Sequence, residues 1–250
     1  QADLGILRGH REGALDRVWR RGKEFLGSEL PIMCGAMTWI SDPQLVSLMS
    51  NLGAFGVLAA GNMPPDLFAQ YVEDTRARTQ RPFAGNVITI APNYLPHLDI
   101  LCERKVSHIV FAGSIPRASE VQKAKDSGAK VLCFASTESI AARMIDYGAD
   151  GLILEGSEAG GHIGHVSTVV LLQEILFKFP DLSIFVAGGI ATGKMIAHLV
   201  LMGAAGAPFP MYMSFIEPVS AFSLDYSVSA LAMPIIGGTA TWVGPVVGAV

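Results

Sequence analysis

The sequence has few cysteines, few charges and no long hydrophobic run, and each shortage excludes a class of protein. The three cysteines are Cys34, Cys102 and Cys133, with no Cys-x-x-Cys pair among them. An odd, scattered set argues against a disulfide framework and favours a reducing compartment, which we take to be the cytoplasm. No stretch reaches the roughly 18 apolar residues of a membrane-spanning helix. The nearest, 230–250, is interrupted by Pro234, so we expect no membrane span.

Charge is sparse as well, since 16% of the residues are charged and the formal net charge is −4. Without a long basic run, we expect no nucleic-acid partner. Half of the residues are hydrophobic, which is enough for a large core and argues against disorder. A length of 250 residues allows one barrel-sized domain or two small ones. No linker or low-complexity segment divides the chain, so a single domain over 1–250 is expected.

Short apolar runs alternate with longer amphipathic segments along most of the chain. Each run is continuous, as expected of strands that are covered on both faces. The expected strands are Pro31–Cys34, Phe55–Ala59, Phe83–Ile88, His108–Ala112, Lys130–Phe134, Gly151–Leu154, Ser183–Ala187 and Ala205–Phe209. The expected helices are Glu12–Glu29, Asp42–Asn51, Pro65–Thr79, Ala118–Ser127, Thr137–Tyr147, Ser167–Phe179 and Gly193–Met202.

This alternation predicts a parallel α/β sheet, and both a doubly wound sheet and a closed barrel have such an order. Completion of eight units by residue 209 favours a (β/α)8 TIM barrel, whose strands fill about residues 30–210. The first helix, Glu12–Glu29, is expected to lead in and cap the barrel floor. The segment after about residue 210, 211–250, is a shortened, atypical tail whose apolar character makes it a candidate homodimer interface.

The most distinctive segment follows the sixth expected strand, where a parallel barrel carries its reactive groups. It reads Glu155-Gly-Ser-Glu-Ala-Gly-Gly-His-Ile-Gly. Its glycines permit unusual backbone angles and close approach to a flat ligand, and His162 can exchange a proton near neutral pH. The alternative is a glycine-rich turn with an incidental surface histidine. His162 and His165 lack a carboxylate at zinc-ligand spacing, so we expect no metal site.

Three further segments lie at the ends of expected strands. Ala187-Gly-Gly-Ile-Ala-Thr-Gly leads into a helix, and its backbone N–H groups could converge on a phosphate, unless the glycines only form a loop. Cys34-Gly-Ala-Met-Thr-Trp could form a wall against an aromatic ring, or its Met and Trp could pack in the core. Asn86 could hydrogen-bond a heterocycle or cap a turn.

Together these segments resemble the nitronate monooxygenase family, formerly called 2-nitropropane dioxygenases, which includes flavin-dependent type II enoyl-acyl-carrier-protein reductases. The resemblance covers about residues 15–206. It rests on Pro31-Ile-Met-Cys-Gly-Ala-Met-Thr-Trp, Asn51-Leu-Gly-Ala-Phe-Gly-Val-Leu, Arg81-Pro-Phe-Ala-Gly-Asn-Val, Glu155-Gly-Ser-Glu-Ala-Gly-Gly-His-Ile-Gly and Phe185-Val-Ala-Gly-Gly-Ile-Ala. Among them, the Glu-Ala-Gly-Gly-His sequence is the specific one.

The resemblance implies an FMN-dependent oxidoreductase with the cofactor at the barrel mouth and a small-molecule substrate. It implies that Ala36 and Met37 lie against the flavin and that Asn86 hydrogen-bonds it. Glu155 would lie at the ribityl or ring edge of the cofactor, and Gly160 and Gly161 would face it. The phosphate would be held by Ala187, Gly188 and Gly189, with Gly203 nearby. It also implies that His162 is the active-site histidine. In nitronate oxidation His162 would take a proton or steady the anionic nitronate, and in the reductases it would orient the substrate.

Two activities fit this resemblance, and a third interpretation lies outside it. The first is oxidation of alkyl nitronates with dioxygen. The second is NAD(P)H-dependent reduction of an enoyl thioester, toward which Trp39 and the Gly-Gly-His-Ile-Gly run lean. The third is a non-catalytic barrel that binds a phosphorylated ligand, and departures from the family pattern motivate it.

The departures lie in two of the expected strands. The family's eighth strand runs Met-Gly-Ala-x-Gly-Val-Gln-Met-Gly-Thr-Arg-Phe, whereas this chain has Met202-Gly-Ala-Ala-Gly-Ala-Pro-Phe-Pro and lacks the second phosphate-binding Gly-Thr. Pro208 and Pro210 also remove backbone donors there. In the third strand, Gly85 stands where the family has an apolar residue, and glycine weakens a strand.

Overall fold

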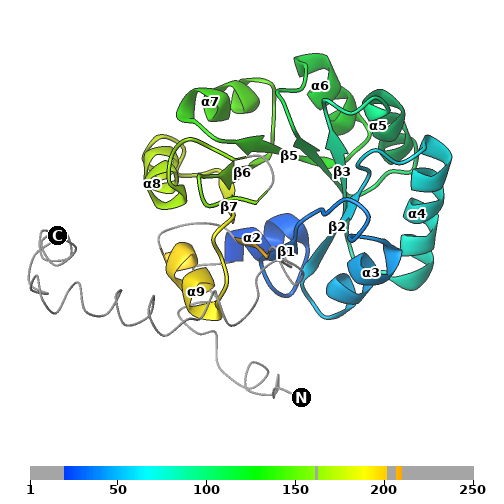
Figure 1. The fold of residues 1–250 in the computed structure, drawn as a ribbon, viewed down its shortest axis with the longest axis horizontal. Coiled ribbons are helices and arrows are strands. Elements are labelled where there is room, and N and C mark those ends of the chain that lie inside the picture. Colours follow the sequence, from blue (N-terminus) through cyan, green and yellow to red (C-terminus); the bar gives the residue numbers. More distant parts are fainter. Residues whose placement is uncertain (1–19, 161–162, 202–206, 210–250) are drawn as a thin grey trace, which may run out of the picture. The chain divides into compact units, whose positions relative to one another are not determined.

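The computed structural model describes residues 20–160, 163–201 and 207–209. The strands are β1 Ile32–Cys34, β2 Phe55–Ala59, β3 Ala84–Ile88, β4 His108–Ala112, β5 Lys130–Ala135, β6 Gly151–Glu155, β7 Ser183–Ala187 and β8 Ala207–Phe209. The helices are α2 Arg20–Leu26, α3 Pro43–Asn51, α4 Pro65–Arg78, α5 Tyr94–Glu103, α6 Ala118–Asp126, α7 Glu138–Asp146, α8 Thr168–Lys178 and α9 Gly193–Leu201. Figure 1 shows the helices α3 to α9 outside the strands.

The strands form a parallel sheet in the order β7-β6-β5-β4-β3-β2-β1-β8. Each of β1 to β7 pairs with its neighbour in sequence, and β1 also pairs with β8. This order confirms the (β/α)8 barrel and not the doubly wound sheet, whose strand order reverses beside the first strand. In the described part of the chain no ladder joins β7 to β8, where Pro208 has no backbone N–H to donate.

Helix α5 was not among the helices expected from the sequence, and its segment contains Pro92 and Pro96. Pro96 lies in the first turn, where a helix needs no backbone donor. The buried face of α5 consists of Tyr94, His97, Leu98 and Leu101, at helical spacing.

Gly85 has its explanation in this helix. A Cβ at Gly85 would lie 2.2 Å from a methyl group of Leu101, so the glycine lets α5 pack directly on β3. The glycine that departs from the family pattern is therefore a packing requirement of this chain.

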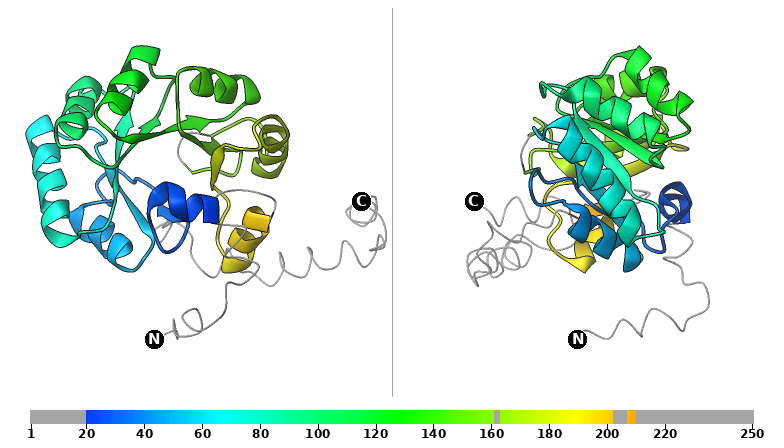
Figure 2. Two further views of the ribbon diagram at one scale, coloured as in Figure 1. Left: turned by 180° about the vertical axis from the view of Figure 1, so that it is seen from behind. Right: turned by 90° about the vertical axis from the view of Figure 1, so that its right-hand side faces the viewer.

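The lead-in helix closes the floor of the barrel, as predicted from the sequence, although residues 12–19 lie outside the described part. Phe25 of α2 packs with Phe55 and Phe185 of the strands, inside the barrel. The Phe25 carbonyl accepts hydrogen bonds from His108 Nε2 (2.8 Å) and Lys130 Nζ (2.5 Å), which begin β4 and β5. These contacts place α2 at the amino ends of the strands and leave the carboxyl ends for the site (Figure 2).

His108 makes the barrel floor sensitive to acid. Burial lowers the pKa of His108 from an ordinary value of 6.5 to about 4. The hydrogen bond from His108 to the Phe25 carbonyl acts in the opposite direction, but its effect is smaller. Between these values the unfolded chain binds more protons than the folded one. The free energy of unfolding is therefore expected to fall as the pH drops from 6.5 toward 4, by at most about 1.4 kcal/mol per pH unit from this residue.

Urea unfolding at about pH 7 and about pH 5 measures this loss. A His108→Gln variant should lose clearly less stability between the two than the unchanged protein, and the exposed His198→Gln is the matched control. An equal loss in the His108 variant would contradict the assignment.

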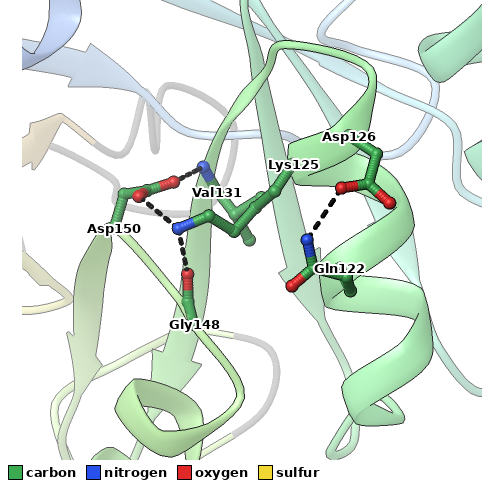
Figure 3. A network of polar contacts seen from close by, with 6 residues as sticks. All are labelled: Gln122, Lys125, Asp126, Val131, Gly148 and Asp150. Atoms are coloured by element: carbon green, nitrogen blue, oxygen red, sulfur yellow. Dashed lines mark hydrogen bonds and ion pairs between the residues drawn. The ribbon is translucent and has the colours of Figure 1, made fainter.

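A polar network holds the amino ends of β5 and β6 together (Figure 3). Lys125 Nζ donates to the Asp150 carboxylate and to the Gly148 carbonyl, both at 2.7 Å. The second carboxylate oxygen of Asp150 accepts from the Val131 N–H at 2.8 Å. Because these groups lie at the end of the barrel opposite the expected site, we assign them to stability, as is usual for this face.

The described residues all belong to one unit, 1–210. The predicted tail, 211–250, lies outside the described residues, and a single domain over the whole chain stays a prediction. Among the described residues, no helix is both long enough and apolar enough to cross a membrane.

Candidate active site

Two polar side chains are built into the inner face of the barrel near its mouth. Strand register alternates inward and outward positions, and Asn86 follows Ala84 on the inner side of β3. Glu155 follows Ile153 on the inner side of β6 and lies in register with Ala187 of β7. The other ionisable side chains on the inner faces of the described strands, His108 and Lys130, lie at the floor. The mouth is therefore mostly apolar, with one amide and one carboxyl group.

Asn86 is 5% exposed, and its Nδ2 donates to the Val110 carbonyl at 3.3 Å. That bond runs across to β4, so the amide holds a fixed orientation inside the barrel and does not cap a turn. A held amide offers both a donor and an acceptor to a heterocycle. The geometry is consistent with the hydrogen-bonding role expected of Asn86.

Glu155 is half-buried at the carboxyl end of β6. Burial raises the pKa of its carboxyl group to about 7. No described residue donates a hydrogen bond or forms an ion pair to this carboxylate. Glu155 can therefore change its charge near neutral pH, which is the property of a proton-exchanging group in a site.

Loop one, residues 35–42, carries Ala36 and Met37 directly after β1. Ala36 packs against the inner barrel cluster. Ser41 Oγ accepts from the Met37 N–H at 2.9 Å and donates to the Gly35 carbonyl at 3.1 Å, so the turn is closed on itself. Trp39 is 61% exposed and has a positive φ of 67°. Packing of Trp39 in the core is therefore wrong.

Loop six, residues 156–167, is fixed at both ends. The Ser157 N–H donates to the Val166 carbonyl at 2.8 Å, and the Gly164 N–H donates to the Gly156 carbonyl at 3.1 Å. Gly160 is exposed at the loop tip. Gly161 and His162, two of the residues expected at the site, lie outside the described residues, so their roles stay predictions.

Loop seven, residues 188–192, continues from Ala187 and leads into α9. Gly188 and Gly189 both have positive φ, 96° and 69°. Thr192 begins the helix, since its hydroxyl and carbonyl oxygens accept from the Met195 N–H at 3.2 and 3.1 Å. The expected partner of this loop, Gly203, lies outside the described residues.

Glu158 and Thr168 join loop six to α8, and no role was predicted for either, although Glu158 begins the Glu-Ala-Gly-Gly-His sequence. Thr168 follows Ser167 at the start of the predicted helix Ser167–Phe179, and Ser and Thr at this position are typical of a helix N-terminus. Glu158 lies ten positions earlier in the chain, and no local pattern relates it to that helix. Within the described residues, no three His, Cys, Asp or Glu side chains gather as they would around a metal ion.

Comparison with known proteins points to one family. The profile described as nitronate monooxygenase matches residues 20–100 and 87–211. A 5-hydroxy-7a-methyl-1-oxo-octahydro-1H-indene-4-carboxyl-CoA dehydrogenase of Rhodococcus jostii is 31% identical over 183 residues, 73% of this chain and 51% of that protein. A nitronate monooxygenase of Paraburkholderia phytofirmans is 27% identical, over 73% of this chain and 62% of that protein.

Solved structures agree on the fold. FabK from Thermotoga maritima superposes with a TM-score of 0.72 at 32% identity, over 76% of this chain and 60% of that one. A nitroalkane oxidase from Streptomyces ansochromogenes gives 0.70 at 25% identity, over 76% and 67%. The chain thus spans about half to two thirds of the length of these proteins.

Proposed function

Because this chain belongs to the nitronate monooxygenase family, we propose that it acts as an FMN-dependent oxidoreductase that oxidises alkyl nitronates with dioxygen. Members of the family are flavin-dependent oxidoreductases. The observation that carries the proposal is that Asn86, Glu155 and the start of α9 all lie at the carboxyl ends of the strands.

The start of α9 fits a phosphate group. Thr192 accepts hydrogen bonds from the N–H groups of Met195 and Ile196, whereas the N–H groups of Gly193 and Lys194 donate to no described residue. Free N–H groups and the positive end of the helix dipole attract an anion. We therefore assign the FMN phosphate to loop seven and the first turn of α9.

The mouth also fits a flat heterocycle. Ala36 and Met37 would line one side of the flavin, and the Asn86 amide would hydrogen-bond its polar edge. When bound, FMN supplies the ability to accept and return electrons. The protein's part is to hold the ring and the substrate in place, with His162 holding the substrate proton or the nitronate charge.

Glu155 would tune the site toward an anionic substrate. A nitronate is negatively charged, and an ionised carboxylate beside it would repel it. With a pKa raised to about 7 by burial, Glu155 is largely neutral below that pH. Nitronate turnover should therefore be higher below about pH 7 than above it.

A second candidate function has its own supporting observation. Large apolar side chains stand exposed on the loops after four strands at the mouth: Trp39, Ile40, Ile90, Ile115 and Ile163. A small nitronate does not need such a rim, whereas a bulky apolar acyl group would bury it. The alternative is thus an NAD(P)H-dependent reductase of an enoyl thioester.

Titration of the purified protein with FMN tests the proposal. We expect bound-flavin absorbance, and under anaerobic conditions we expect ethylnitronate to bleach it. Bleaching by NADPH alone would favour the reductase. A protein that takes up no FMN would be a phosphorylated-ligand binder at most, and the oxidoreductase proposal would be wrong. Dimerisation and a cytoplasmic location stay predictions from the sequence.

A further inference from the structure

Loops six and seven meet along one short segment, Glu158-Ala159. A Cβ on Gly188 would lie 2.4 Å from the Ala159 Cα atom, and a Cβ on Gly189 would lie 2.9 Å from the Glu158 Cβ atom. These are distances that real Cβ atoms do not tolerate. The glycine pair therefore lets the backbone of loop six lie directly on loop seven.

The Glu158 carboxylate anchors that same segment to α8. Its Oε2 atom accepts from the Thr168 N–H at 2.8 Å and from the Thr168 hydroxyl at 2.7 Å. The Ser157 hydroxyl adds a third bond at 3.3 Å. The N-cap residue of α8, Ser167, makes no side-chain capping bond. Glu158 thus supplies from a distant position the acceptor that an N-cap residue normally provides.

Electrostatics support this anchor. A negative charge is stabilised at the positive end of a helix dipole. Partial burial alone would raise the pKa of Glu158, but the hydrogen bonds from Thr168 outweigh it and lower the pKa. The carboxylate therefore stays ionised near neutral pH, and the anchor persists through the range in which Glu155 titrates.

We propose that Glu158 is a positioning residue that couples the two loops, so that FMN binding at loop seven and the position of Glu158-Ala159 in loop six depend on each other. The segment that rests on the glycine pair is the one that Glu158 ties to α8. Neither loop can move without loss of contact with the other. Coupling of this kind is reciprocal, so whatever loosens loop six must also weaken the ligand at loop seven. The inference rests on the proposed FMN site for its ligand only.

The test compares Glu158→Ala, Glu158→Gln and Thr168→Val with an exposed control on α8, Glu174→Gln. Amide hydrogen exchange is first measured without FMN. We expect faster exchange in Glu158→Ala at Ser157 and Gly164 of loop six and also at Met195 and Ile196, whose N–H groups donate to Thr192 at the end of loop seven, with the rest of the barrel unchanged. Glu158→Gln and Thr168→Val, which each retain part of the anchor, should show smaller effects in the same places.

Binding of FMN is then measured by quenching of its fluorescence. Glu158→Ala should bind roughly 5- to 100-fold more weakly than the unchanged protein, although Glu158 is assigned no contact with the phosphate. The control should bind normally. If Glu158→Ala does not fold, the other two variants decide by the same measurements.

The outcomes separate the two proposals. If the unchanged protein does not bind FMN, the proposed function fails, and the exchange at Met195 and Ile196 still decides the coupling. If the protein binds FMN but the Glu158 variants match it in both affinity and exchange at loop seven, the coupling is wrong. Faster exchange confined to loop six would also overturn it, since Glu158 would then be only a helix cap.

Discussion

Gly188→Ala is expected to weaken FMN binding by about tenfold or more and to displace loop six. Two costs add at this position. A non-glycine residue at a φ of 96° is strained by roughly 1 kcal/mol or more. The new Cβ would also lie 2.4 Å from the Ala159 Cα atom and 2.6 Å from its nitrogen. Because both are backbone atoms, no side-chain rotation can relieve the clash, and one of the loops has to move.

Gly128→Ala is the matched control, since Gly128 has a similar φ of 91° but free space where its Cβ would lie, away from the proposed site. It should leave FMN affinity nearly unchanged. Isothermal titration with FMN measures this affinity. If Gly188→Ala binds FMN as tightly as the control, the close packing of loops six and seven has no part in the site.

His162→Ala is expected to lower turnover with ethylnitronate by roughly 10²-fold, because proton exchange by a positioned group contributes rate enhancements of this size. Its FMN absorbance should persist, because the phosphate and the ring are assigned to other residues.

Glu155→Gln should affect turnover differently from His162→Ala. It removes the group with a pKa of about 7, so turnover should lose its decline above neutral pH while the maximal rate changes less.

Steady-state kinetics of both variants across about pH 5 to 9, with absorbance spectra for FMN content, check this pair of expectations. Unchanged turnover in His162→Ala would reduce that histidine to a loop residue. A pH profile of Glu155→Gln that matches the unchanged protein would assign the titration to another group.

Most of the barrel could be predicted from local pattern. The strands Phe55–Ala59, His108–Ala112 and Ser183–Ala187 have the same bounds in the structure as in the sequence prediction, because a strand covered on both faces is a continuous apolar run. Helix α5 was not predicted, and it tolerates Pro96 because it starts just before that residue, at Tyr94. Gly85 gave no hint of its partner Leu101, since that contact joins two different elements.

The sequence by itself determined the order of the strands and of the helices other than α5, the family, and the segments that form the mouth, since these follow from periodicity and motif within a few residues of chain. Only the tertiary structure decided that Asn86 and Glu155 share the inner face of the barrel and that burial raises the pKa of Glu155. It alone decided that Glu158 caps α8 and supports the glycine pair of loop seven. The physical reason is that burial and contact between residues far apart in the sequence depend on how the elements pack. A local sequence pattern does not encode this packing.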